Sequence, residues 1–132
     1  MNRRSFIALA AILPFAQMAQ AADATVYTPE AVAAELAAGK TVVLDFSADW
    51  CPSCQTQGRQ ISALRAENPG YADMLAFFVV DWDTYKSSEL AEKYGITHRG
   101  SIVVLRGDAV VTQTATHSDK AALKAIFDAA AS

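Results

Sequence analysis

Residues 45–54 read Asp-Phe-Ser-Ala-Asp-Trp-Cys-Pro-Ser-Cys and contain the only two cysteines of the 132-residue chain, Cys51 and Cys54. They follow an apolar run over 41–46, and the apolar spacing after them predicts a helix over 51–67. At a helix N-terminus the first thiol meets free backbone N–H groups and the positive end of the helix dipole, which favour its thiolate. A bridge at this spacing closes a very short loop and adds little stability. The pair is therefore interpreted as a reversible dithiol/disulfide couple rather than a structural bridge.

The first 21 residues have the pattern of an export signal. A basic start with Arg3 and Arg4 precedes an apolar stretch over 6–16, which is too short for an ordinary membrane span. Small residues over 19–21 then offer a cleavage site after Ala21. Residues 3–7 also fit the twin-arginine pattern, so the export route stays open, and a retained N-terminal anchor is the alternative. We predict a periplasmic protein whose residues 22–132 form one compact domain.

The charge balance argues against nucleic acid as a partner. The chain has 11 basic and 14 acidic residues, for a net charge of −3, and removal of the signal would also remove Arg3 and Arg4. No basic stripe remains along the sequence, whereas proteins that bind nucleic acid usually carry one.

Strand and helix patterns alternate along the rest of the chain. The pattern predicts an edge strand at 22–26, a helix from Thr28 to Gly39, strands at 41–46 and 75–80, a helix at 88–94, a hairpin of 102–105 with 110–115, and a last helix after 117–119. This alternation predicts an α/β fold in which a central mixed sheet of four to five strands has helices on both faces.

Three stretches of the sequence resemble the thioredoxin family, and the resemblance covers residues 24–130. They are residues 43–46 leading into 50–54, residues 80–83 followed by 89–96, and residues 102–105 before a tight turn. The resemblance implies a thioredoxin-like fold and thiol–disulfide oxidoreductase activity on protein thiols and disulfides. It also implies that no cofactor is used besides the redox-active pair itself.

The resemblance also implies roles for three residues. Cys51 is expected to be the attacking thiolate, because it is nearer the helix N-terminus and should be the more exposed of the two cysteines. Cys54 is the resolving thiol. Asp45 matches the family's buried carboxylate, which accepts a proton, and desolvation inside an apolar strand would raise its pKa toward neutrality. The alternative for Asp45 is a strand-end carboxylate that caps the following turn.

Five further residues are expected to contact the substrate: Trp50 and Pro52 beside the cysteines, and Arg99, Gly100 and Ser101 in the loop that should face them. The family places a cis-proline in this loop where the present chain has Gly100. Because a cis bond without proline costs about 2.5–4 kcal/mol, we expect a trans bond before Gly100. A second departure is Val79, which stands where the family often has a lysine near the buried acid.

The leading functional hypothesis is a periplasmic thiol–disulfide oxidoreductase, a reductase or thiol carrier rather than an oxidase. The oxidases that resemble this fold carry a sizeable inserted helical domain, for which residues 22–132 have no room. Such a reductase would act as a monomer and take its electrons from a membrane thiol donor. The alternative is a copper or zinc carrier that uses Cys51, Cys54 and His98, although His98 could equally be a solvated loop residue. An inactive interaction module is the third hypothesis.

Overall fold

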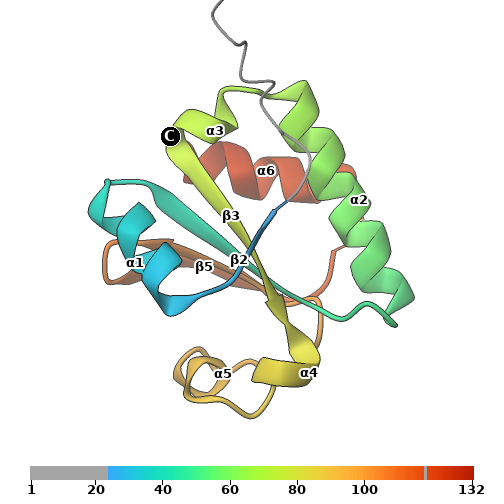
Figure 1. Ribbon diagram of the computed structural model, residues 1–132. Coiled ribbons are helices and arrows are strands. Elements are labelled where there is room, and N and C mark those ends of the chain that lie inside the picture. Colours follow the sequence, from blue (N-terminus) through green and yellow to red (C-terminus); the bar gives the residue numbers. More distant parts are fainter. Residues whose placement is uncertain (1–23, 118) are drawn as a thin grey trace, which may run out of the picture.

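The computed structural model (Figure 1) describes residues 24–117 and 119–132, so the predicted export signal lies outside the described ranges. Within these ranges, no helix has both the length and the apolar character needed to cross a membrane.

A five-stranded mixed sheet forms the centre of the fold, in the order β1-β3-β2-β4-β5. The strands β1 and β2 run parallel to β3, whereas β4 runs antiparallel to β2 and to β5. This arrangement confirms the predicted mixed sheet, its edge strand and its terminal hairpin. Their bounds are Thr25–Val26 (β1), Thr41–Ser47 (β2), Leu75–Asp81 (β3), Ile102–Arg106 (β4) and Ala109–Thr114 (β5).

The described part of the chain forms six helices around the sheet, and two of them are single turns that the sequence pattern did not predict. Four residues are too few to show an apolar period, so neither α3 nor α4 leaves a signal in the sequence. The other four helices confirm the predicted ones to within a few residues. Their bounds are Pro29–Ala37 (α1), Pro52–Glu67 (α2), Tyr71–Met74 (α3), Trp82–Tyr85 (α4), Glu89–Lys93 (α5) and Lys120–Ala130 (α6).

Alternation along β2 places its side chains on two faces, and each face is covered by helices. Leu44 and Phe46 pack with residues of α1 and α5, whereas Val43 packs with residues of α2 and α6. In Figure 1, α2 and α6 lie together on one side of the sheet. Asp45 shares the α2 side with Val43, so the strand delivers a carboxylate beneath the helix that begins at the cysteines.

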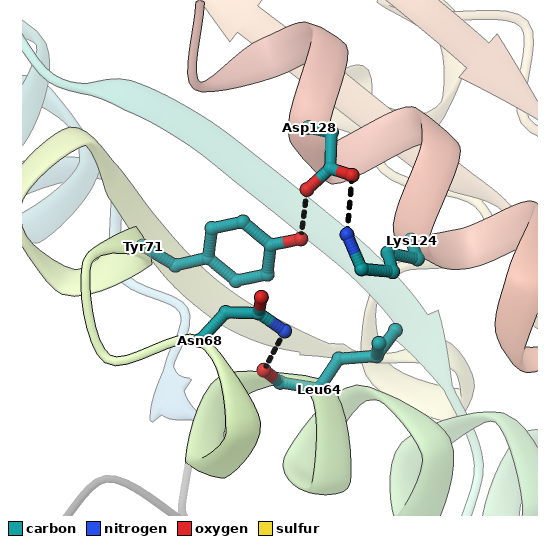
Figure 2. A network of polar contacts seen from close by, with 5 residues as sticks. All are labelled: Leu64, Asn68, Tyr71, Lys124 and Asp128. Carbon is teal, nitrogen blue, oxygen red and sulfur yellow. Dashed lines mark hydrogen bonds and ion pairs between the residues drawn. The ribbon is translucent and has the colours of Figure 1, made fainter.

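Polar contacts fix the far end of α2 (Figure 2). The side chain of Asn68 donates to the carbonyl oxygen of Leu64 at 2.8 Å and closes the helix. The Tyr71 hydroxyl donates to Asp128 of α6, and Lys124 forms an ion pair with the same carboxylate at 2.6 Å. Because this end is tied to α6, the opposite end of α2 has a defined position on the sheet.

Candidate active site

The turn between β2 and α2 positions the two cysteines. Cys51 is the N-cap of α2, and its Sγ accepts a hydrogen bond from the backbone N–H of Cys54 at 3.3 Å. Pro52 occupies the first helical position, where its missing N–H costs nothing. The side-chain amide of Gln55 donates to the carbonyl oxygen of Ala48 at 3.1 Å, across the turn. The first sulfur therefore lies at the positive end of a 16-residue helix.

The prediction that Cys51 is the more exposed cysteine is wrong. The exposed fraction is 0 % for Cys51 and 1 % for Cys54. The Nε of Arg99 donates to Cys51 Sγ at 3.2 Å, and the hydroxyl of Ser53 lies 3.3 Å from the same sulfur. The sequence could not show this cover, because Arg99 lies 48 residues further along the chain.

The two thiols have opposite pKa shifts. Burial acts to raise the pKa of Cys51, but hydrogen bonds from Cys54, Ser53 and Arg99 outweigh it and lower the pKa to about 7. Burial raises the pKa of Cys54, and the hydrogen bond to Cys51 adds to that rise. One thiol is thus partly ionised near neutrality, while its neighbour holds its proton.

Asp45 lies in the middle of the sheet, with Val79 of β3 and Ile102 of β4 as its register partners. Burial raises the pKa of Asp45 to about 7, the hydrogen bond from Gln57 acts against that rise, and the charge of Cys51 adds to it. The expectation of a carboxylate that titrates near neutrality is confirmed. The turn-capping alternative is wrong, because the Asp45 carboxylate accepts from the Gln57 amide at 2.9 Å.

Gln57 is a site residue that sequence reasoning missed. Its side chain is fully buried, and its amide nitrogen donates to Asp45 at 2.9 Å and to the Gly100 carbonyl oxygen at 3.0 Å. Its amide oxygen accepts from the backbone N–H of His117 at 2.6 Å. A signal existed, since Gln57 lies on the same helix stripe as the buried Cys54 and Ile61. Gln57 therefore joins the buried acid to two chain segments that face the cysteines.

The loop before β4 pairs with the end of β2. The backbone N–H of Gly100 donates to the Phe46 carbonyl oxygen, and the N–H of Phe46 donates to the Ser101 carbonyl oxygen at 3.0 Å. A proline at position 100 could not donate the first of these bonds. The peptide bonds of the described residues are all trans, which confirms the expectation for Gly100, and its φ is +81°.

Gly100→Ala is expected to destabilise the protein by about 1–3 kcal/mol, the usual cost of a side chain held in the left-handed region. A Cβ at this position would lie 2.1 Å from the Thr116 hydroxyl oxygen, which itself donates to the Arg99 carbonyl oxygen. Urea unfolding of both proteins measures the difference. Gly58→Ala is the matched control, because a Cβ added there would meet no neighbouring atom within 4 Å and the residue sits inside α2. Equal unfolding midpoints for the two variants would contradict this account of the loop.

The other predicted contact residues fall into two groups. Trp50 is 56 % exposed, its indole N–H donates to Asp83 at 2.8 Å, and the Arg99 guanidinium lies 4.8 Å from its ring centroid. Pro52 is exposed at the start of α2. In contrast, Ser101 is buried and donates to the His98 carbonyl oxygen at 2.6 Å, so its side chain braces the loop.

The structure does not bring His98 to the cysteines as a metal ligand. His98 is exposed, and its Nδ1 lies 2.8 Å from the Thr97 hydroxyl. Among residues 24–117 and 119–132, no group of three or more histidine, cysteine or acidic side chains is placed to hold a metal ion. His98 thus lies as an exposed loop residue, as its solvated-loop interpretation describes, and the metal-carrier alternative stays a prediction.

Two hollows flank the cysteine pair. A groove of about 320 Å³ on the loop side is lined by Ser53, Trp82, His98, Arg99 and Thr116, among others. A hollow of about 600 Å³ on the α2 side reaches Asp45 and Cys54, between apolar residues that include Val43 and Val79. Cys54 and Asp45 therefore both line the α2-side hollow, called the rear hollow below, whereas the loop-side groove reaches Ser53 and Arg99, two residues that contact Cys51 Sγ.

Comparison with known proteins shows which family and which solved structure the chain is similar to. The family model described as thioredoxin matches residues 23–129. A thioredoxin H-type of Fagopyrum esculentum is 37% identical over 68 residues, which are 52% of this chain and 53% of that protein. The thiol:disulfide interchange protein TxlA of Synechococcus elongatus is 33% identical over 94 residues, 71% of this chain and 47% of that protein. The chain thus spans about half the length of these relatives.

A solved structure is similar over nearly its whole length. The crystal structure of Trxlp from Edwardsiella tarda EIB202 matches with a TM-score of 0.70 and 25% sequence identity, and the match covers 80% of this chain and 98% of that one.

Proposed function

This chain belongs to the thioredoxin family, whose members are thiol–disulfide oxidoreductases, and from that membership we propose that it reduces disulfides of proteins outside the cytosol. The observation that carries the proposal is the placement of the Cys51 sulfur at the N-terminus of α2. There the Cys54 N–H and the Arg99 Nε donate to it, and these bonds help to lower its pKa to about 7, while burial raises the pKa of the adjacent Cys54. Only the thiolate attacks a disulfide, so Cys51 reacts in the first step, whereas Cys54 stays protonated until the second step.

The proposed reaction has two exchange steps. The Cys51 thiolate attacks one sulfur of the partner disulfide, so that a Cys51–partner bond forms, the partner's own S–S bond breaks, and the released partner thiolate takes a proton. Cys54, once deprotonated, attacks Cys51 Sγ, which forms the Cys51–Cys54 disulfide and releases the second partner thiolate to be protonated. Two electrons and two protons pass from the dithiol to the partner.

Asp45 is the proposed acceptor of the Cys54 proton. Its carboxylate and Cys54 both line the rear hollow of about 600 Å³. A pKa of about 7 lets Asp45 accept a proton near neutral pH and return it to solvent through that hollow. The proposed electron carriers are the two cysteines, in keeping with a family whose chemistry uses no further cofactor.

The direction of electron flow and the compartment are parts of the same proposal. A Cys51 pKa of about 7 resembles that of thioredoxin, which is about 7, rather than the value of about 3.5 found in a strong periplasmic oxidant. The sequence of residues 1–21 supports export to the periplasm. A reductase in that compartment takes its electrons from a thiol donor in the membrane.

Insulin reduction tests the activity. Residues 22–132, supplied with a chemical reductant, are expected to precipitate insulin faster than the reductant alone. A rate at background, the same for this protein and for Cys51→Ser, would contradict the proposed activity. The reduction potential of the Cys51–Cys54 pair then tests the direction, since about −270 mV is expected for a reductase and about −120 mV would indicate an oxidase.

A further inference from the structure

Arg99 contacts the Cys51 sulfur from the loop side, and Ala48, Cys54 and Trp82 pack around the same residue. Cys51 has an exposed fraction of 0 %, and its sulfur is in polar contact with the Arg99 guanidinium on the loop side and with the Ser53 hydroxyl and the Cys54 backbone N–H on the helix side. The guanidinium also lies over the ring of Trp50, 4.8 Å from its centroid. Arg99 is itself an exposed residue on a loop, so its side chain can swing away. A partner that approaches Cys51 from the loop side therefore meets this cation.

No carboxylate of the described residues pairs with Arg99. The ion pairs within residues 24–117 and 119–132 are formed by Lys40, Lys120 and Lys124. The acid beside Trp50, Asp83, receives the indole N–H at 2.8 Å. The Nε of Arg99 is used by the sulfur, whereas a guanidinium has five donors arranged as a planar fork that suits a carboxylate.

Formation of the mixed disulfide removes the negative charge from the sulfur that Arg99 contacts. Before the reaction its partner is the Cys51 sulfur, which is an anion when deprotonated. When that sulfur bonds to the partner protein, the negative charge moves to the leaving sulfur and the guanidinium loses its counter-charge. A carboxylate close to the partner's reacting cysteine would replace it with a charge-assisted hydrogen bond pair.

We propose that Arg99 is a specificity-determining residue, which selects partner segments that carry a carboxylate beside the reacting cysteine. The preference is local, because Asp49, Asp81 and Asp83 are exposed around the same site and would repel a partner with spread negative charge. This inference rests on the proposed exchange activity, which supplies the reaction in which the partner segment meets Arg99.

The first test needs no disulfide exchange. The reduced protein is alkylated with iodoacetate, which is an anion, and with neutral iodoacetamide, and the ratio of the two rates at low salt is compared between variants. Both reagents consume the same thiolate, so a change in its amount cancels in the ratio. Arg99→Gln should lower the ratio by about fivefold to tenfold, the range from an exposed ion pair to a bidentate one. Arg99→Lys should retain part of the preference for iodoacetate, because it keeps the positive charge.

Arg59→Gln is the matched control, because it removes one positive charge from α2, where the Arg59 guanidinium bonds the Thr56 hydroxyl at 3.0 Å. Its ratio should equal that of the unchanged protein. An iodoacetate preference that survives in Arg99→Gln, or that Arg59→Gln lowers equally, would overturn the assignment of Arg99.

The second test uses short disulfide peptides that differ only in the residue beside the cysteine, which is aspartate, asparagine or lysine. Oxidation of the reduced protein by the aspartate peptide should be about fivefold to tenfold faster than by the lysine peptide, and Arg99→Gln should bring the two rates together. Equal rates for both peptides with the unchanged protein would overturn the proposed selectivity. Failure of every peptide, the asparagine one included, would instead contradict the exchange activity, and the alkylation ratio would still report on Arg99.

Discussion

Cys51→Ser is expected to abolish disulfide exchange, whereas Cys54→Ser should complete the first step and stop there. The Cys51 sulfur lies at the helix N-terminus with three hydrogen-bonding groups around it, so it is the sulfur whose thiolate is stabilised. A serine hydroxyl at this position is not ionised near neutral pH, and the rate should fall by several orders of magnitude to background. Without Cys54, the mixed disulfide has no internal thiol to release it.

Mass spectrometry separates the two variants. After incubation with an excess of a disulfide peptide, Cys54→Ser should gain the mass of one peptide half on Cys51, and Cys51→Ser should gain nothing. Ser53→Ala is a useful companion, since it removes one bond to the sulfur but leaves both cysteines in place. Accumulation of the peptide adduct on Cys54 of Cys51→Ser, at a rate like that of the other variant, would reverse the proposed roles.

The elements that carry the site could be predicted because their signals are local. The apolar run before Cys51 marks β2, and the helix after it follows from spacing, so an aspartate within the strand had to share a sheet face with other buried residues. The raised pKa of Asp45 follows from that placement alone, because burial disfavours the charged form of any carboxyl group.

What could not be predicted depends on contacts between distant residues. Arg99 and Trp82 both contribute to the cover of Cys51, and the position of the loop that carries Arg99 depends on Gln57 and Thr116. In a sequence, a glutamine on a helix is ordinarily assigned to solvent. Only the folded chain shows that Gln57 satisfies a carboxylate and two backbone groups at once.

The conformation of the loop at Gly100 also could not be predicted from the sequence. The sequence shows only that the proline that fixes the backbone of this loop in the family is replaced by glycine. In the structure, the glycine adopts a positive φ and donates to Phe46, so the loop is held by a bond that proline would remove. The loop facing the cysteines is therefore ordered by other means, and Arg99 is held in front of the sulfur.

Asp45→Asn should slow resolution of the mixed disulfide by about 10²–10⁴-fold, the usual contribution of a positioned base. The first step should change little, because Asp45 contacts Gln57 rather than the Cys51 sulfur. Rapid mixing with a disulfide peptide, with formation and decay of the mixed disulfide followed separately, measures each step. If formation and decay slow equally, Asp45 does not act on Cys54.

The same substitution should stabilise the reduced protein, and the sign follows from the direction of the pKa shift. The folded-state pKa of about 7 lies above the value of about 3.9 in the unfolded chain, so the folded state binds the extra proton between these values. The stability that Asp45 contributes is therefore greatest below about pH 4 and is lost as the pH rises to 7. Asp45→Asn should be more stable by up to about 4 kcal/mol at pH 8, the free energy that corresponds to this difference between the two pKa values, and nearly equal at pH 4.

Urea unfolding at the two pH values measures this difference, and Asp49→Asn is the control, because it removes a carboxylate that is exposed at the surface. The oxidised protein should show a smaller gain, because the charge of Cys51 that adds to the Asp45 shift is absent when the sulfur is in a disulfide. A gain that is the same at pH 4 and pH 8 would mean that Asp45 is already ionised at low pH in the folded state. If Asp45→Asn both gains stability at pH 8 and slows the resolution step, the buried carboxyl group of Asp45 destabilises the fold but serves as the base for Cys54.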